Sequence, residues 1–465
     1  MDKKPNIVFV FADEWRKQAT GYAGDENCRT PVLDSLSRQS VNFVNATSGC
    51  SVCCPYRASL VTGQYPLTHG IFINDVELDP SCYSIARAFN DGGYDTGYIG
   101  KWHLYGSPDG KYSRRGDYVP REYQLGFGYW KGFECCHGYN KSPYFFNDDP
   151  TRHMWEGYDA FGQSRDAAEY IRTHADGEKP FMLMLSWGPP HFPLDSAPPE
   201  YRALYEDAEI KLPPNVPEDH REKAVERLRG YYSHIAALDD CMGIVLDAVD
   251  EAGIADDTIL VFTSDHGDMM ESQGLGTKLF PFDESILVPF LLRYPKLGDA
   301  GNREIAVPID APDIMPTLLS LAGLPIPESV EGTDWSAIIK GEREPTGDEA
   351  ALLSIASEFT EICRNGMKAY RGLRTARHTY VRDADGPWLL FDNEADPHQM
   401  RNLVGRPEAK ELQAELEAKL QARLDAMGDE FLDGEVYLER AGLTHYREVG
   451  NASEHREWHY PWDGV

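Results

Sequence analysis

Four runs of apolar, β-branched and aromatic residues divide the first part of the chain. A continuous run of this kind is typical of a strand that is buried on both faces in a parallel sheet. The runs cover residues 6–11, 94–99, 180–187 and 258–263. Ionisable residues follow each run, in the order Asp13 and Glu14, Lys101 and His103, His191, and Asp265 and His266. Because open parallel sheets place their sites outside the carboxyl ends of their strands, we expect these residues to share one site.

Helical patterns alternate with these strands. One predicted helix covers residues 219–252 after a proline-rich segment, and another covers residues 311–322 before Gly323. Strands and helices in alternation predict an α/β fold, with a large, mixed, mostly parallel sheet sandwiched by helices.

The composition changes after about residue 340, which indicates a second, smaller unit. Residues 370–382 and 388–392 have the pattern of antiparallel strands, and a helix is predicted over residues 407–427. Leucines recur at four-residue spacing on that helix, at Leu412, Leu416, Leu420 and Leu424. We therefore expect a large domain over residues 1–345 and an α+β subdomain over residues 346–465, with a short antiparallel sheet, one helix and an aromatic tail at residues 455–462.

Residues 105–166 form an insert in which the periodic signal fades and Gly, Tyr and Arg are frequent. The simplest interpretation is a solvated loop region with aromatic side chains packed beneath it. A long insert beside a candidate site is also where substrate contacts commonly arise.

The charge balance excludes some partners. The chain has 45 basic and 76 acidic residues, for a net charge of −31, which repels nucleic acid and anionic membranes. An anionic substrate therefore requires a locally positive pocket. The nine cysteines are odd in number and include adjacent pairs, so free thiols are expected.

No apolar run has the length of a membrane span. We expect a cytoplasmic protein if Met1 is the natural start, and a periplasmic or secreted one if a leader has been removed.

Residues 50–63, CSVCCPYRASLVTG, predict a loop that leads into a short helix. Pro55 suits the first turn and Gly63 suits a left-handed stop. Cys53 then lies at the positive end of the helix, where a nucleophile can be presented to an anion. Cys50 and Cys53 also form a C-x-x-C pair, which could be a redox pair or half of a zinc site, but the chain offers no second pair with matching spacing.

Three carboxylates and an imidazole follow the first and last of the four predicted strands, at Asp13, Glu14, Asp265 and His266. Oxygen ligands favour Ca²⁺ or Mg²⁺, and the histidine leaves room for Mn²⁺.

The spacing of Cys53, Pro55 and Arg57, followed by Thr62 and Gly63, resembles the activation signature of the type I sulfatases in the alkaline phosphatase superfamily. Cys53 is the only cysteine in register with that signature. The resemblance implies that Cys53 is converted to formylglycine, whose hydrated aldehyde is the nucleophile. The partner in that conversion would be a formylglycine-generating enzyme or an anaerobic sulfatase-maturating enzyme.

The resemblance also implies a metal site and catalytic roles. One divalent ion, most often Ca²⁺, would be held by the formylglycine at position 53 together with Asp13, Glu14, Asp265 and His266. Arg57, Lys101 and Lys278 would supply a positive field. His103 would take a proton from the hydrate, and His191 with Lys278 would protonate the leaving group.

We expect hydrolysis of sulfate monoesters, with a sulfated carbohydrate as substrate. Asn74 falls where several family members place an amide on the substrate sulfate, and the insert offers further contacts in Arg114, Arg115, Arg121 and His137. Two alternatives remain: a phosphonate monoester or phosphodiester hydrolase of the same superfamily, and a catalytically silent glycan-binding protein that keeps Cys53 unmodified. Neither nucleic acid nor a membrane is expected as a partner.

Overall fold

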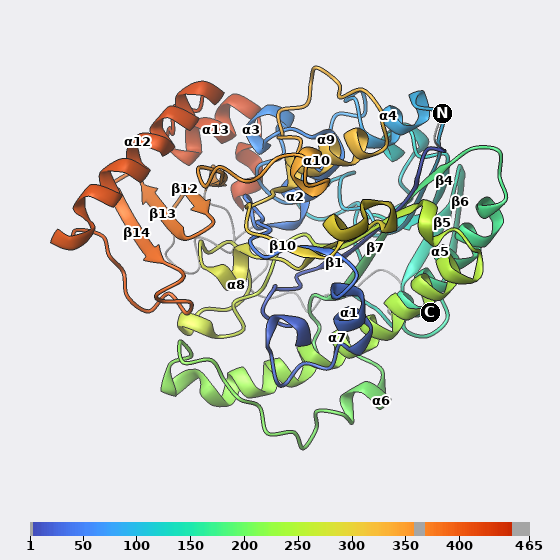
Figure 1. The fold of residues 1–465 in the computed structure, drawn as a ribbon, viewed down its shortest axis with the longest axis horizontal. Helices are drawn as coiled ribbons and strands as arrows, with labels where there is room; N and C mark the ends of the chain where they lie inside the picture. Colours follow the sequence, from blue (N-terminus) through green and yellow to red (C-terminus); the bar gives the residue numbers. More distant parts are fainter. Residues whose placement is uncertain (1–2, 358–367, 449–465) are drawn as a thin grey trace.

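The computed structural model describes residues 3–357 and 368–448 (Figure 1). The aromatic tail predicted at residues 455–462 lies outside this range. The described chain forms one sheet of ten strands and one of four. Helices cover both faces of the large sheet, and the small sheet lies at one end of the molecule with α12 (Lys410–Met427) against it (Figure 1).

The centre of the large sheet is parallel. Strands β8, β1, β7, β3 and β4 run side by side in parallel, and antiparallel pairs flank them. The strand order is β10 (Arg303–Ile305), β2 (Val41–Phe43), β9 (Phe290–Arg293), β8 (Thr258–Ser264), β1 (Asn6–Asp13), β7 (Phe181–Pro190), β3 (Asp95–Lys101), β4 (Tyr129–Phe133), β5 (Pro143–Phe146) and β6 (Asp149–Met154). The predicted fold class is confirmed, and each of the four predicted strands is present.

Strand β1 divides the interior into two cores. Ile7, Phe9 and Phe11 belong to one core, while Val8 and Val10 belong to the other, because successive side chains of a strand point to opposite faces. The first core includes residues of α2 (Cys53–Thr62), α4 (Ile85–Asp91), α9 (Ala311–Leu321) and α10 (Ser336–Ile339). The second includes residues of α1 (Pro31–Ser37), α5 (Asp159–Ala175) and α7 (Arg221–Glu251). The other described α-helices are α3 (Pro66–His69), α6 (Pro199–Arg202), α8 (Asp283–Ile286) and α13 (Gly434–Ala441).

The small sheet is antiparallel throughout. It consists of β11 (Ala350–Ile355), β12 (Tyr370–Thr375), β13 (His378–Asp383) and β14 (Gly386–Asp392). Leu416, Leu420 and Leu424 of α12 are buried against it, and Leu412 is partly buried, as their spacing predicts.

The two sheets share packing. Leu353 and Ile355 of β11 belong to the same core as α2 and α9. A backbone hydrogen bond of 2.8 Å joins Ser354 to Gly49, and Arg374 forms an ion pair of 3.1 Å with Asp283. The division at residues 345 and 346 remains a prediction, because these contacts join the two parts into one body.

The insert is more ordered than the sequence predicts. It contributes β4, β5 and β6 to the edge of the large sheet. Tyr98, Trp102 and Trp130 pack ring to ring with centroid distances of 4.9–5.1 Å. Widely spaced aromatic residues give no strand periodicity, so this packing cannot be seen in the local pattern.

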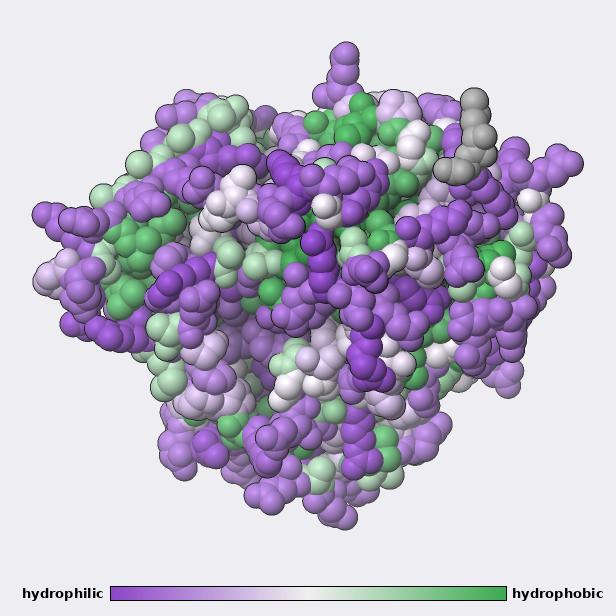
Figure 2. Space-filling view, viewed as in Figure 1, coloured by the Kyte–Doolittle hydropathy of each residue, from purple (hydrophilic) through white to green (hydrophobic). Residues whose placement is uncertain are grey.

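Hydrophilic residues dominate the face shown in Figure 2, and the hydrophobic patches on it are scattered. This agrees with the strongly acidic composition. Among the described residues, no helix is both long and apolar enough to cross a membrane.

Candidate active site

Cys53 is the first residue of α2, and its side chain is buried. Pro55 lies in the first turn, and Gly63 ends the helix with a left-handed φ of 68°. The positive end of the helix dipole favours an anion at this position. Cys54 lies in the apolar core instead, where its Sγ accepts a hydrogen bond of 3.2 Å from the backbone N–H of Asp75.

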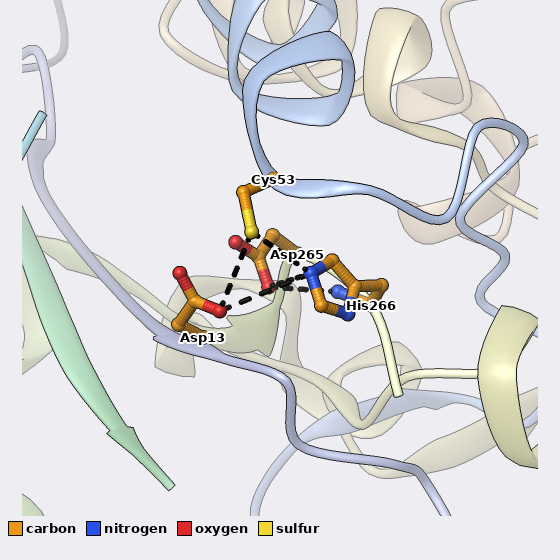
Figure 3. Close-up of side chains that lie close together, drawn as sticks. All are labelled: Asp13, Cys53, Asp265 and His266. Atoms are coloured by element: carbon orange, nitrogen blue, oxygen red, sulfur yellow. Dashed lines mark hydrogen bonds and ion pairs between the residues drawn. The ribbon is translucent and has the colours of Figure 1, made fainter. Parts of the chain in front are cut away.

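The carboxyl ends of β1 and β8 bring two acidic residues and a histidine to Cys53 (Figure 3). The strands pair in parallel, with Ala12 opposite Ser264, so the residues that follow them lie together. Asp13, Asp265, His266 and Cys53 offer ligand atoms that all lie within 4.8 Å of one another, and all four residues are buried.

The distances within this cluster are short. The Sγ atom of Cys53 is 3.3 Å from His266 Nε2 and 3.7 Å from Asp13 Oδ1. His266 Nε2 is 3.6 Å from Asp265 Oδ1. His266 Nδ1 lies 3.0 Å from the carbonyl oxygen of Gly267, a contact that orients the ring with Nε2 toward the cluster.

This donor set fits a divalent cation. It combines carboxylate oxygens with an imidazole nitrogen in a fully buried position. Burial lowers the pKa of His266, but Asp265 and Cys53 raise it to about 10. A cluster that binds a proton so tightly has a negative potential that suits a metal ion. The residues Asp13, Asp265 and His266, with the group at position 53, therefore fit a cation.

Glu14 is not one of these four residues but belongs to a second group that shares Asp13 with them. Its backbone has a left-handed φ of 71°. Its carboxylate Oε2 is 3.2 Å from His191 Nε2, and Oε1 is 3.6 Å from Lys278 Nζ. Burial raises the pKa of this carboxyl well above its usual range. In this structure Glu14 groups with Asp13 and His191, so direct metal ligation by Glu14 stays a prediction.

Two buried cations neutralise the strand ends. Arg57 Nη2 is 3.0 Å from Asp13 Oδ2 and 3.0 Å from Asp265 Oδ2. Its Nη1 donates to the Lys101 carbonyl oxygen at 2.9 Å and to Ser186 Oγ at 2.8 Å. The Lys101 ammonium forms a short ion pair with Asp13. The guanidinium is thus locked in place, and both cations lie beside the position of the nucleophile.

Lys278 is a third buried cation beside Cys53. Its Nζ donates to Cys53 Sγ at 3.5 Å and to His191 Nε2 at 2.9 Å. Burial and the nearby Lys278 hold the pKa of His191 well below its usual range, so this imidazole is neutral. Burial and Asp13 raise the pKa of the Cys53 thiol, but Lys278, Lys101 and His266 outweigh them and place it well below the usual value.

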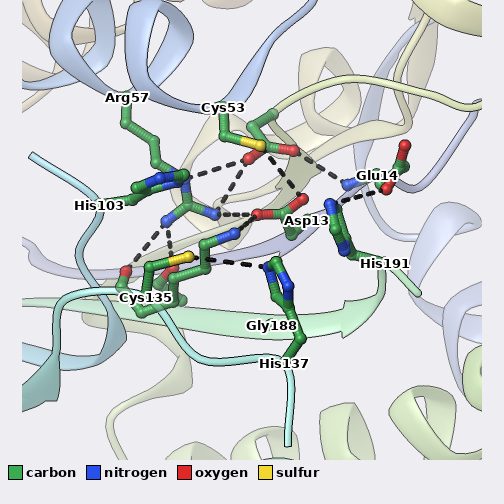
Figure 4. Close-up of polar contacts among 12 residues, drawn as sticks. Asp13, Glu14, Cys53, Arg57, His103, Cys135, His137, Gly188 and His191 are labelled. Carbon is green, nitrogen blue, oxygen red and sulfur yellow. Dashed lines mark hydrogen bonds and ion pairs between the residues drawn. The ribbon is translucent and has the colours of Figure 1, made fainter. Parts of the chain in front are cut away.

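Two further histidines lie at the edge of this cluster (Figure 4). His137 stacks on His191 with ring centroids 4.3 Å apart. The Sγ atom of Cys135 is 3.7 Å from His137 Nε2. His103 is buried, and its Nε2 is 3.4 Å from Asp75 Oδ1.

The other predicted substrate contacts are engaged within the protein. Asn74 Oδ1 accepts the backbone N–H of Cys54 at 3.0 Å. Arg114 pairs with Glu77 at 2.6 Å, Arg115 pairs with Asp75 at 2.6 Å, and Arg121 lies 3.6 Å from Asp148 on the surface. His137, which is also a predicted insert contact, stacks on His191 of the candidate active site. The roles of these residues in substrate binding remain predictions.

Sequence reasoning missed Asp75, Cys135 and Ser186. Ser186 lies inside an apolar strand and gives no signal of its own. Asp75 directly follows Asn74, so the same turn that was singled out for its amide also carried the carboxylate.

Comparison with known proteins identifies the group to which this arrangement belongs. Residues 5–324 match the sulfatase family model, and residues 272–426 match the model of the N-sulphoglucosamine sulphohydrolase C-terminal region. The chain is 43% identical to an ulvan-active sulfatase of Formosa agariphila over 94% of this chain and 84% of that protein.

Solved structures have the same fold. One from a study of glycosaminoglycan metabolism by Bacteroides thetaiotaomicron is 28% identical, with a TM-score of 0.82 over 94% of this chain and 99% of that chain. The phosphonate monoester hydrolase of Agrobacterium radiobacter is 22% identical, with a TM-score of 0.70 over 90% of this chain and 96% of that chain. The family match over residues 5–324, the relative at 43% identity and the cluster around Cys53 agree, and the chain belongs to the sulfatase family.

Proposed function

We propose that this protein hydrolyses sulfate monoesters of a sulfated carbohydrate, with formylglycine at position 53 and one divalent metal ion. The observation that carries the proposal is the convergence on Cys53 of an acidic metal-type cluster and three buried cations, Arg57, Lys101 and Lys278. On a chain with a net charge of −31, buried cations gathered around one nucleophile position are the feature expected of a sulfate pocket.

The metal and the formylglycine would lie at the cluster around position 53. Asp13, Asp265 and His266 would hold the metal, which would supply positive charge to the sulfate oxygens. Ca²⁺ is the first candidate because oxygen donors predominate, and Mg²⁺ or Mn²⁺ are alternatives. Formylglycine at position 53 would supply a hydroxyl nucleophile, and its formation requires a maturating enzyme.

The chain's own residues bind and orient the sulfate. Arg57 is held by two carboxylates and by Ser186, so its position costs no reorganisation during the reaction. Lys101, paired with Asp13, and Lys278, in contact with Cys53, would stabilise charge on the sulfate oxygens.

Lys278 and His191 form the proton-donating pair. Lys278 Nζ donates to the neutral His191 at 2.9 Å, so the proton available to a leaving oxygen resides on Lys278. His103 is proposed to handle the proton on the other side of the nucleophile.

The carbohydrate substrate is supported by the relative from Formosa agariphila, which is described as an ulvan-active sulfatase. The phosphonate monoester hydrolase shares the fold, so a phosphonate is the substrate that competes with this proposal. The sequence resemblance favours sulfate, because Lys101 and His103 match the sulfatase pattern that the phosphonate enzymes lack.

The test is sulfate release after coexpression with a formylglycine-generating enzyme. The protein should release sulfate from sulfated oligosaccharides, with a higher kcat/KM than for nitrophenyl sulfate. Cys53→Ala should abolish release, and Cys82→Ala is the control, because that thiol lies outside the cluster around Cys53. Equal or better turnover of a phosphonate monoester would overturn the proposal.

A further inference from the structure

The carboxylate of Asp75 lies between two buried side chains. Its Oδ1 accepts from Arg115 Nε at 2.9 Å, and its Oδ2 accepts from Arg115 Nη2 at 2.6 Å. The same Oδ1 is 3.4 Å from His103 Nε2. Asp75 and His103 are each 2% exposed, and Arg115 is 9% exposed. A two-point ion pair fixes both the position and the plane of the carboxylate.

The backbone around this pair is also held. Asp75 and His103 both have left-handed φ values, of 61° and 59°, which cost free energy in residues other than glycine. The Asp75 carbonyl oxygen accepts the N–H of Ser107 at 2.7 Å and the hydroxyl of Tyr446 at 3.1 Å. Its N–H donates to Cys54 Sγ at 3.2 Å. The carboxylate therefore cannot swing away from His103 without breaking several contacts.

Stability alone does not explain this pair. Burying two charges costs several kcal/mol of desolvation, and a well-packed apolar pair is often at least as stable. The neighbouring Arg114 forms an ion pair with a lower desolvation cost, since it pairs with Glu77 in a position where both side chains are about one-third exposed. The buried pair touches a histidine beside the nucleophile, and that contact suggests its purpose.

The groups that face His103 determine its charge. They are the carboxylates of Asp75 and Glu134 and the sulfur atoms of Cys54 and Cys135. Burial lowers the pKa of His103, but Cys135, Cys54 and Asp75 raise it well above the usual range. Burial raises the pKa of Asp75, but Arg115 and His103 lower it below its usual range, so Asp75 stays ionised.

We propose that Asp75 and Arg115 are positioning residues for His103, with the ion pair fixing the carboxylate and the carboxylate fixing the tilt and protonation of the imidazole. The catalytic part of this inference rests on the proposed function. Arg115 then acts through Asp75 and not on the sugar, although the sequence places it among the candidate substrate contacts.

The kinetic experiment separates positioning from substrate binding. Asp75→Asn should lower kcat on the order of 10- to 100-fold with little change in KM, as is typical when the partner of an active-site side chain is removed. Arg115→Lys keeps the charge but loses the two-point geometry, and it should lower kcat less. Arg377→Gln, the matched control, breaks a two-point pair with Asp392 in the small sheet and should leave kcat and KM unchanged. A rise in KM at constant kcat in Arg115→Lys would mean direct substrate contact and would overturn the proposal.

The titration of His103 gives a readout that needs no turnover. In nitrogen-15 spectra of histidine-labelled full-length protein with unmodified Cys53, the His103 signal is the one that His103→Gln removes. Asp75→Asn should move its titration midpoint to lower pH, because a negative charge is lost, and Arg377→Gln should not move it. An unchanged midpoint in Asp75→Asn would overturn the inference.

Two further outcomes have clear meanings. If wild-type protein releases no sulfate but the titration midpoint of His103 moves in Asp75→Asn, the positioning role stands and the proposed function fails. If Asp75→Asn does not fold because Arg115 loses its carboxylate partner, the double variant of Asp75→Asn with Arg115→Gln removes both charges. The kinetic and titration experiments are then carried out on this double variant. A double variant with wild-type kcat and midpoint would refute the role.

Discussion

At the scale of single residues, burial decides how the ionisable groups behave. Lys101, Arg57 and Asp13 are almost inaccessible to water, yet each has an opposite charge within hydrogen-bond distance. Pairing of this kind keeps buried groups charged. A buried carboxyl without a cationic partner responds in the opposite way, and Asp159 at the start of α5 is such a group, since burial raises its pKa to about 7.

We predict that Asp159→Asn stabilises the protein more at about pH 8 than at about pH 5. In the unfolded chain an Asp ionises near pH 3.9, and in the folded protein Asp159 ionises near pH 7. Its contribution to the free energy of unfolding therefore falls as pH rises from about 4 to about 7. The Asp159→Asn variant does not lose this stability, because asparagine does not ionise. Between pH 5 and pH 8 the difference has an upper limit of about 3 kcal/mol, since Asp159 ionises near pH 7 and one pH unit corresponds to about 1.4 kcal/mol.

Thermal unfolding of both proteins at the two pH values checks this. Glu169→Gln, on the exposed side of the same helix, is the control and should give the same small difference at both. A larger gain for Asp159→Asn at the acidic pH would contradict the assignment.

At the scale of elements, the site exists because strand ends and one helix end meet. Strands β1 and β8 supply the acidic cluster, α2 supplies the nucleophile position, and the loop after β8 supplies Lys278. These elements are far apart in sequence, so a ligand that bridges them should stabilise their packing.

We therefore predict that chelation of the metal lowers Tm as well as activity. A ligand at one hundred times its Kd adds about 2.7 kcal/mol to the free energy of unfolding, and that amount is lost on its removal. Differential scanning calorimetry with and without EDTA measures it. Asp265→Asn should show a smaller response to the chelator, and equal sensitivity of both proteins would argue against metal at this cluster.

The helix α12 offers a second test at this scale. Leu420 is 0% exposed between α12 and the small sheet, whereas Leu412 on the same helix is partly buried. Leu420→Ala should destabilise the protein by about 2–5 kcal/mol in chemical denaturation, because it leaves a cavity. Leu412→Ala should cost clearly less. Equal costs would show that α12 packs differently on the small sheet.

At the scale of the whole molecule, the sequence predicts whatever depends on local pattern. The four apolar strands, the helices α7, α9 and α12, and the cluster of Asp13, Asp265 and His266 follow from periodicity and from the rule for strand ends. The strands β4 to β6 have no clear periodicity and were expected to be loop. The pairing of Arg115 with Asp75 spans 40 residues, and no local pattern reveals a partner at that separation.

The burial of α2 has a consequence for how the protein is made. Every residue from Cys53 to Thr62 is buried, and Cys53 is 1% exposed. A second enzyme therefore cannot bind this segment once the chain has folded. If Cys53 is converted as proposed, the conversion must compete with folding, during or shortly after synthesis. Adding a formylglycine-generating enzyme to the folded cysteine form should give no aldehyde by mass spectrometry, while the urea-unfolded chain should be converted. A molecule that folds before conversion would keep cysteine at position 53. The active fraction of a preparation would therefore equal the fraction of molecules converted before folding.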